Sequence, residues 1–272
     1  IDKVPEAKTL ADKWILEQVH QIIFDTNKNI EEFNFSYVGE QLRSFTWDQL
    51  ADWYLEIVKI EGNKSEILNY ILNTLLKLWH PFMPFVTEQI WSEIYGEDKM
   101  LMVESWPSPS YQEGAGGVAV DFELIKNIIT GIRSLRAENK IEPAKKLNVS
   151  ISAGDRVDLL KANAEVIKGL ARLEELTIQE KVEKPETAVG FVESGVEVFV
   201  DLSGAVDVEA EKIRLEKEID TVEPYIQGLE KKLGNAEFVN NAPEKVVEME
   251  KKKLTEAKEK LAKLKSQLEN LN

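Results

Sequence analysis

Apolar residues recur at helical spacing through roughly the first hundred residues of the chain. The stretch TLAD, Thr9–Asp12, has the pattern of a capping box, and the apolar face that follows it continues to Ile30. A second helical stretch ends at Gly62, and a third runs from Ser65 to Trp79. The wide apolar surface of this third helix indicates that it is buried against more than one neighbour.

Two prolines, Pro81 and Pro84, interrupt the helical pattern within the stretch LWHPFMPFVTEQIW. Because proline disfavours the α conformation for the residue before it, the third helix should end near Trp79, and Pro84 should begin a fourth helix. We expect Phe82 and Phe85 to wedge between the helices at this rigid joint. The buried side of the fourth helix is expected to comprise Val86, Ile90, Trp91 and Ile94. Four helices of this kind predict a bundle.

The pattern changes after Met102 to Val120, a stretch rich in Pro, Ser and Gly that is typical of a linker. A helix is expected over 122–136, and a second over 157–173. Runs of β-like residues surround the second helix, at 147–151, 176–182, 188–192 and 196–202, the last two joined at Ser194–Gly195. These elements predict a small α+β unit.

From Val208 the apolar residues follow a heptad pattern on two segments joined by a short turn. Gly234 should end the first segment, and Pro243 suits the first turn of the second, so an antiparallel coiled-coil hairpin is predicted. Two residues break the pattern: Pro224 should kink the first helix, and Glu250 occupies a core position. The predicted fold class is therefore mainly α, with a helical bundle (1–109), a small α+β subdomain (110–206) and an antiparallel coiled-coil hairpin (207–272).

Composition narrows the class of protein. The 272 residues are 43% hydrophobic, which is enough to bury real cores, and no apolar run approaches the length of a membrane span. The chain has no Cys, which excludes disulfides and thiolate zinc sites and fits a reducing, cytoplasmic compartment. It begins IDKVPEAKTL, in the middle of a pattern and without Met, so we expect a fragment of a longer protein.

The net charge of −15 argues against a nucleic-acid partner, because a negatively charged protein repels a polyanion. The distribution changes this picture. The segment from Lys126 to Lys146 contains six basic and two acidic residues, and the segment from Lys245 to Lys265 contains eight Lys and four Glu. These two basic clusters are where a polyanion could bind.

The sequence carries no catalytic constellation. Its two histidines, His20 and His80, have no metal-binding partner at ligand spacing, so no metal site is predicted. The GAGG stretch, Gly114–Gly117, neither follows a strand nor precedes Lys-Ser/Thr, and so indicates a linker instead of a phosphate loop. We therefore expect no catalytic residues and no cofactor in this chain.

Several stretches resemble a known family. LADKWIL, FTWDQLADWYLEIVK, LLKLWHPFMPFVTEQIW and MVESWP resemble, in this order, the anticodon-binding helical bundle of the class I aminoacyl-tRNA synthetases for valine, isoleucine and leucine. IRSLRAENKIEPAKKL, DLSGAVDVEAEKIRLEKEI and LGNAEFVNNAPEKVVEMEKKKL are similar to the C-terminal part of the valyl family. The turn Phe238–Val247 is the most specific of these signals.

The resemblance implies a function that the residues alone do not. It implies the tRNA-binding C-terminal part of a valine–tRNA ligase, which recognises the anticodon and contacts the tRNA body. The implied partners are a valine-specific tRNA and the upstream catalytic and editing domains of the same polypeptide. The resemblance implies a monomer and no membrane partner. The parent enzyme would use ATP and Mg²⁺, while this chain alone, which has no HIGH-like or KMSKS-like stretch, would be inactive.

Basic residues in three places are the candidate nucleic-acid contacts. On the first two helices the candidates are Lys13, Lys28 and Arg43. The anticodon would be recognised there through unstacked bases that pack against aromatic or Arg side chains of the bundle. After the linker, Arg133 and Arg136 share a helix face and are followed by Lys140. On the hairpin the candidates are Arg214, Lys217, Lys231, Lys232, Lys251, Lys252 and Lys253.

Two alternatives stay open at this point. The fragment could belong to an isoleucyl or leucyl enzyme, which the identity of the retained tRNA would reveal. It could also be a non-enzymatic coiled-coil interaction module, an acidic bundle with an arm that binds protein. Salt separates this last case, since tRNA binding weakens steeply with salt through counterion release.

Overall fold

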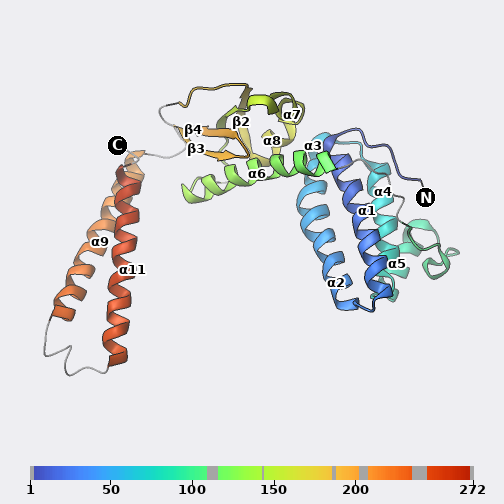
Figure 1. Cartoon of the computed structure of the whole chain (residues 1–272), viewed down its shortest axis with the longest axis horizontal. Helices are drawn as coiled ribbons and strands as arrows, with labels where there is room; N and C mark the ends of the chain where they lie inside the picture. The colour runs from blue at the N-terminus through green and yellow to red at the C-terminus, as the bar shows by residue number, and fades with distance from the viewer. Residues whose placement is uncertain are drawn as a thin grey trace. The chain divides into compact units, whose positions relative to one another are not determined.

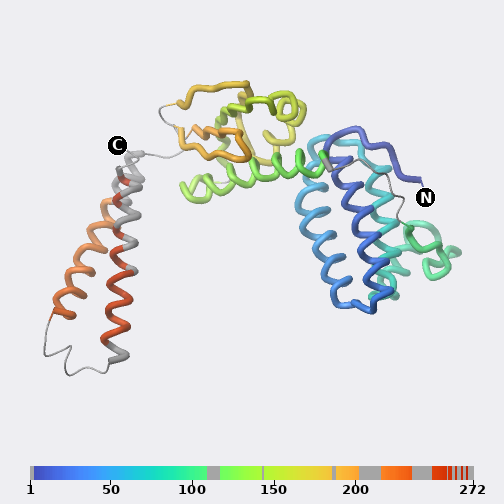
Figure 2. The backbone as a smooth tube through the Cα atoms, in the orientation of Figure 1, coloured from blue at the N-terminus to red at the C-terminus, as the bar shows by residue number. Residues whose placement is uncertain are grey.

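The computed structural model describes residues 3–108, 116–142, 144–185, 188–201, 208–234 and 244–269 (Figure 1). The remaining segments are drawn in grey in Figure 2. The chain divides into two compact units, Ile1–Asp201 and Leu202–Asn272. Most of the described residues are helical, and the first unit also holds a small four-stranded mixed sheet.

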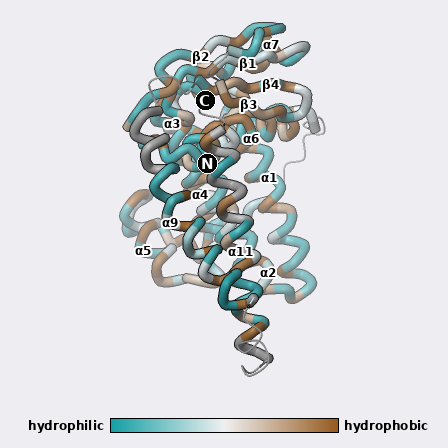
Figure 3. Tube along the Cα trace, turned by 90° about the vertical axis from the view of Figure 1, so that its left-hand side faces the viewer, coloured by the Kyte–Doolittle hydropathy of each residue, from teal (hydrophilic) through white to brown (hydrophobic). Residues whose placement is uncertain are grey.

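The first unit opens with a bundle of helices that lie side by side in Figure 1: α1 (Leu10–Glu31), α2 (Phe35–Ser44), the π-helical η1 (Phe45–Tyr54), α3 (Leu55–Glu61), α4 (Ser65–Trp79) and α5 (Pro84–Tyr95). The predicted capping box is confirmed, because Thr9 Oγ1 accepts from the Asp12 N–H and Asp12 Oδ2 accepts from the Thr9 N–H. The helical segment 35–61 ends at Gly62, whose φ of 67° lies in the left-handed region that favours glycine. Hydrophobic stretches alternate with hydrophilic ones along these helices (Figure 3), as amphipathic packing requires.

A buried polar network ties the bundle together beneath the capping box. The fully buried Asp12 carboxylate accepts from Lys64 Nζ at 2.7 Å and from the Tyr54 hydroxyl at 2.8 Å. Lys64 also pairs with Glu61 at 2.9 Å. Burial raises the pKa of Asp12, but the hydrogen bonds from Lys64 and Tyr54 outweigh it and hold the net pKa below its ordinary value. The network therefore contains an ionised carboxylate whose neighbours satisfy both of its oxygens.

The proline joint is partly as predicted. α4 ends at Trp79 and Pro84 occupies the first turn of α5, which confirms the expected break. Of the expected buried side of α5, the prediction is confirmed for Trp91 and wrong for Val86, Ile90 and Ile94, which are exposed. The predicted wedge is wrong for Phe85, whose side chain is 90% exposed. The Thr87 hydroxyl donates to backbone carbonyls at the joint and contacts the His80 ring, so the buried stripe of α5 is Thr87 and Trp91. α5 carries two stripes of large side chains, and the helical period alone does not say which one faces the bundle.

The rest of the first unit is the sheet with its covering helices. α6 (Gly116–Glu138) leads to the sheet, whose order is β2-β1-β4-β3, with β1 parallel to β2 and the other pairs antiparallel. The strands and their connecting helices are β1 (Leu147–Ser152), η3 (Gly154–Arg156), α7 (Val157–Ala162), α8 (Ala164–Ala171), β2 (Leu173–Gln179), β3 (Ala188–Glu193) and β4 (Val196–Asp201). The short 3₁₀ turn η2 (Leu101–Val103) precedes them.

Several details of this region differ from the sequence prediction. α6 begins at Gly116, inside the stretch expected to be a linker and before the expected start at Phe122. The single helix expected over 157–173 is broken at Asn163, whose side-chain amide donates to the Leu159 carbonyl at 2.8 Å. α8 ends at Ala171, and after Arg172 in a left-handed conformation β2 begins at Leu173, earlier than expected. The predicted hairpin at Ser194–Gly195 is confirmed, with positive φ at both residues.

α6 packs against both the bundle and the sheet. The Phe122 ring stacks on Trp14 of α1, with ring centroids 4.2 Å apart. On the sheet side Gly131 makes room for Phe191 of β3: an added Cβ would lie 2.4 Å from the ring. Ile128, Ile129 and Ile132 of α6 are completely buried, so bundle and sheet share one core and form one compact unit.

The second unit consists of α9 (Val208–Gly234) and α11 (Glu244–Glu269), which lie side by side. Ile219, Val222, Ile226 and Ala257 form its buried core, and Leu254, Leu261 and Leu268 pack against them. Ion pairs link the helices at Lys232–Glu250 (3.2 Å), Glu230–Lys258 (2.7 Å) and Glu223–Lys265 (2.8 Å). α9 is helical through Pro224, and the predicted turn with Pro243 lies outside the described residues.

Candidate nucleic-acid interface

The candidate cations of the bundle are exposed and far apart. Lys13 lies in the first turn of α1 and Lys28 in its last turn, about 22 Å apart at 1.5 Å per residue. Arg43 is exposed in the last turn of α2. Lys13 and Lys28 therefore cannot contact the same phosphate.

An aromatic pocket of about 590 Å³ lies at the end of α1, whose last turn also carries Lys28. It is lined by Asn27, Ile30, Glu31, Phe35, Pro81, Phe82 and Trp106. The Trp106 indole N–H donates to Asn27 Oδ1 at 2.6 Å, and the Asn27 amide donates to the Pro107 carbonyl, so this ring is held in place. Phe35 and Trp106 remain 49% and 42% exposed.

The aromatic pocket was missed from the sequence. Phe35 and Trp106 are 71 positions apart, and only the fold brings them to the same end of the bundle. The proline joint contributes Pro81 and Phe82, so its role includes shaping this pocket. The exposed rings offer flat apolar faces, which is the chemistry on which unstacked bases pack.

Arg136 serves the fold and is buried, with 8% of its surface exposed. Its guanidinium donates to the carbonyls of Lys145 (2.5 Å), Ala171 (2.9 Å) and Arg172 (3.1 Å). The Ala171 and Arg172 carbonyls lie at and just beyond the end of α8, where a helix leaves carbonyls without internal partners, and Lys145 precedes β1. This geometry argues against the predicted phosphate contact for Arg136, because the side chain is buried and three of its five N–H donors already bind carbonyls.

Arg133 has a mixed environment one turn earlier on α6. Two of its nitrogens donate to the Leu170 carbonyl, at 3.1 and 2.9 Å, and its guanidinium lies 5.5 Å from the centre of the Trp53 ring. Burial lowers the pKa of Arg133, and the charge of the nearby Arg172 lowers it further. Part of the side chain stays exposed, but its main contacts cap α8 and join α6 to the bundle.

Lys126 forms a second cation–aromatic contact along α6. Its ammonium lies 5.7 Å from the Trp14 ring and 5.6 Å from the Trp53 ring, and it pairs with Glu123 at 3.0 Å. Lys140 is exposed just after α6, with a positive φ of 53°. Much of the basic cluster between Lys126 and Lys146 therefore holds α6 to its neighbours, and Lys140 is the member of the predicted set that projects outward.

The cations of the second unit are exposed. Lys217, Lys231, Lys251 and Lys252 lie on the surface, as do Lys232 and Lys253, while the side chain of Arg214 lies outside the described residues. Glu250 is buried at its core position, as its heptad place predicts, and pairs with Lys232 and with Lys253 at 3.1 Å. Hydrogen bonds from Lys253 and Lys232 lower the pKa of Glu250. The whole Lys251–Lys253 run thus reaches the surface.

Within the described residues, no group of three or more His, Cys, Asp or Glu side chains could hold a metal ion. None of the helices in the described part of the chain is long and apolar enough to cross a membrane.

Residues 12–151 match the family model described as the anticodon-binding domain of tRNA ligase. The chain therefore belongs to this tRNA ligase family. Residues 207–272 match a second model, the valyl tRNA synthetase tRNA binding arm. The first match covers the bundle, α6 and most of β1, and the second covers α9 and α11.

Three relatives of the chain carry the name valine–tRNA ligase. A valine–tRNA ligase of Enterococcus faecalis is 34% identical over 275 residues, one of Geobacillus kaustophilus 35% over 276, and one of Desulfotalea psychrophila 33% over 273. These matches cover 96 to 97% of this chain but 31% of each relative. The chain thus spans about a third of the length of these relatives.

Proposed function

We propose that this chain is the tRNA-binding C-terminal part of a valine–tRNA ligase. The observation that carries the proposal is the match of residues 207–272 to the tRNA-binding arm of the valyl enzymes. The anticodon-binding match alone describes tRNA ligases in general. The arm and the names of the relatives both favour valine over isoleucine or leucine.

The proposal divides the chain by task. The bundle (1–109) recognises the anticodon. The α+β subdomain (110–206) connects the bundle to the arm along the chain. The pair α9–α11 forms an antiparallel coiled-coil arm (207–272) that contacts the tRNA body. The order of the ion pairs supports the arm, because later residues of α9 pair with earlier residues of α11. In the parent enzyme, a cytoplasmic monomer, upstream domains of the same polypeptide perform the ATP- and Mg²⁺-dependent aminoacylation and the editing.

The aromatic pocket is the proposed place of anticodon recognition. Lys28 neutralises backbone charge beside it, while Phe35 and Trp106 supply stacking faces for bases. Lys13, Arg43, Lys140 and the exposed lysines of the arm act as separate phosphate contacts. Their spread along the chain suits a long partner, because each contact positions a different part of the RNA backbone.

The test compares two exposed phenylalanines of the bundle. Phe35→Ala should weaken filter binding of valine tRNA to the 272-residue chain by about 1–3 kcal/mol, the cost of losing one stacked base. Phe85→Ala is the matched control, since Phe85 is 90% exposed and does not line the pocket. An anticodon-substituted valine tRNA should bind weakly to the wild-type chain and lose little more with Phe35→Ala.

Three outcomes would contradict the proposal in different ways. Equal wild-type binding of the normal and the anticodon-substituted tRNA would remove anticodon recognition from this chain. Preferred retention of isoleucine or leucine tRNA would point to one of those enzymes. Binding that does not respond to salt would favour the protein-interaction module, since phosphate contacts release counterions.

A further inference from the structure

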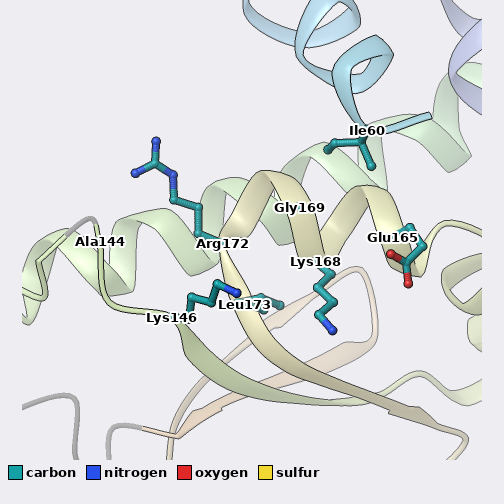
Figure 4. A pocket seen from close by; sticks show the side chains of 8 residues that line it. All are labelled: Ile60, Ala144, Lys146, Glu165, Lys168, Gly169, Arg172 and Leu173. Atoms are coloured by element: carbon teal, nitrogen blue, oxygen red, sulfur yellow. The ribbon is translucent and has the colours of Figure 1, made fainter. Parts of the chain in front are cut away.

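An open pocket of about 440 Å³ lies in the first unit, away from the aromatic pocket (Figure 4). The end of α3, the chain before β1, and the last turns of α8 with the start of β2 form its walls. Its lining residues are Ile60, Ala144, Lys146, Glu165, Lys168, Gly169, Arg172 and Leu173. Lys168 and Arg172 fall in 152–206, between the two segments that the family models match.

The pocket is built on fixed elements. Gly169 lets α8 approach the bundle closely, because an added Cβ would lie 2.5 Å from Ile60 Cδ1. Arg133 and Arg136 bind the carbonyls of Leu170, Ala171 and Arg172 and so fix the end of α8. The Arg172 backbone takes a left-handed conformation there, with φ of 55°, and its side chain is exposed. The positions of the cations are thus set by packing before any ligand arrives.

The charge of the pocket is positive in a chain whose net charge is −15. Three cations line it against the single carboxylate of Glu165. Lys146 also pairs with Glu174 at 3.4 Å, but both side chains are about 60% exposed, so water and salt screen this pair. The charge of Arg172 adds to burial in lowering the pKa values of Arg133 and Arg136. Positive charge therefore accumulates at the pocket.

The polar side chains among the described lining residues are all charged. Ile60, Ala144 and Leu173 give an apolar surface between Lys146, Glu165, Lys168 and Arg172. Figure 4 shows the Lys146 and Lys168 side chains extending to the same side of the end of α8, while Arg172 extends to the other side. Two ammonium groups on one side and a guanidinium on the other suit consecutive negative groups along a strand.

We infer that this pocket binds the sugar–phosphate backbone of tRNA, with Lys146 and Lys168 contacting one phosphate and Arg172 contacting a neighbouring one. The inference rests on the proposed function and adds to it a contact site in the α+β subdomain, which lies between the anticodon-binding bundle and the arm in the sequence. Because phosphate contacts carry no sequence information, the site adds the same affinity for any tRNA.

The experiment measures tRNA affinity of the full 272-residue chain across a salt series. The double variant Lys146→Ala/Lys168→Ala should flatten the slope of log K against log salt by about 1, the effect of one lost phosphate contact. Arg172→Ala should flatten it by a similar amount. The loss should be equal for valine tRNA and for a tRNA of another specificity.

The matched control is Lys161→Ala/Lys184→Ala, which removes two exposed lysines of the same unit that do not line the pocket. Tryptophan fluorescence melting checks that each variant folds, and Lys168→Gln serves as a second, near-isosteric variant. Pocket variants with the slope of the control would overturn the inference and leave the proposed function standing, as would losses confined to one tRNA. Absence of tRNA binding by the wild-type chain would overturn both.

Discussion

Arg136→Ala should destabilise the first unit strongly. The substitution removes three hydrogen bonds from a charged donor to backbone carbonyls, and the residue is buried. Hydrogen bonds to charged groups contribute about 1.5–3 kcal/mol each. The variant no longer has the cost of burying a charged guanidinium, and water can hydrate the freed carbonyls. These two effects offset part of the summed hydrogen-bond energy, so we expect the free energy of unfolding to fall by about 3 kcal/mol.

Tryptophan fluorescence is the suitable probe, because all six tryptophans lie between Trp14 and Trp106 and so report on the first unit alone. For a unit of about 200 residues, a loss of about 3 kcal/mol corresponds to a decrease in Tm of roughly 6–12 °C. Arg133→Ala should cost about half as much, since Arg133 binds a single carbonyl and stays partly exposed.

Arg136→Lys separates the structural role from the phosphate role that the sequence predicted. It keeps the positive charge but loses the planar fork that reaches three carbonyls. We expect it to lower Tm clearly while leaving the salt dependence of tRNA binding unchanged. A variant Arg136→Ala that melts like the wild type and flattens the salt slope by about 1 would refute the structural reasoning and restore the phosphate contact.

Two further predictions concern the buried network and α6. The net pKa of Asp12 is lowered from 3.8 and that of Lys64 is raised from 10.5, so their pairing stabilises the fold between these pH values and is lost as pH falls below about 4 or rises past 10.5. Asp12→Asn should therefore lower the free energy of unfolding by about 3 kcal/mol at pH 7 and flatten the acid limb of a Tm–pH profile. An unchanged acid limb would contradict this prediction. In urea melts, Gly131→Ala should lower the free energy of unfolding by about 1–3 kcal/mol, because the added methyl group clashes with Phe191. Gly39→Ala should raise it by up to about 1 kcal/mol, because a Cβ there meets open space on α2. Destabilisation by both substitutions would point to helix geometry and not to packing.

Element types followed closely from local signals. The capping box at Thr9, the break at Trp79, the hairpin at Ser194–Gly195 and the bounds of α9 at Val208 and Gly234 all rest on residues whose backbone preferences act over a few positions. The break at Asn163 was missed, because a side-chain hydrogen bond to Leu159 competes with the helix in a way that a period count does not register.

The site was harder to predict than the fold for a physical reason. A charge pattern shows where cations stand along the chain but not what they contact, and Arg136 binds carbonyls that lie 9 to 36 positions away. The aromatic pocket combines Phe35 with Trp106 through tertiary structure alone. Lys168 and Arg172 are four positions apart, which is the spacing of residues that share a helix face. That signal for the second pocket was misleading, because Arg172 lies beyond the end of α8 in a left-handed conformation and its side chain extends to the other side.

The order of the sheet has a consequence for how this chain would aggregate. β2 and β3 are the two outer strands, and each is paired on one side within the described residues. The β2 edge carries the exposed Glu174 and Glu175, whose charge repels a second copy. The β3 edge instead exposes Val189 and Val192, the latter to 66%, in a run with little charge. Strand-to-strand association of partly unfolded chains should therefore begin at β3, and a lysine at position 192 would be the simplest protection for an expression variant.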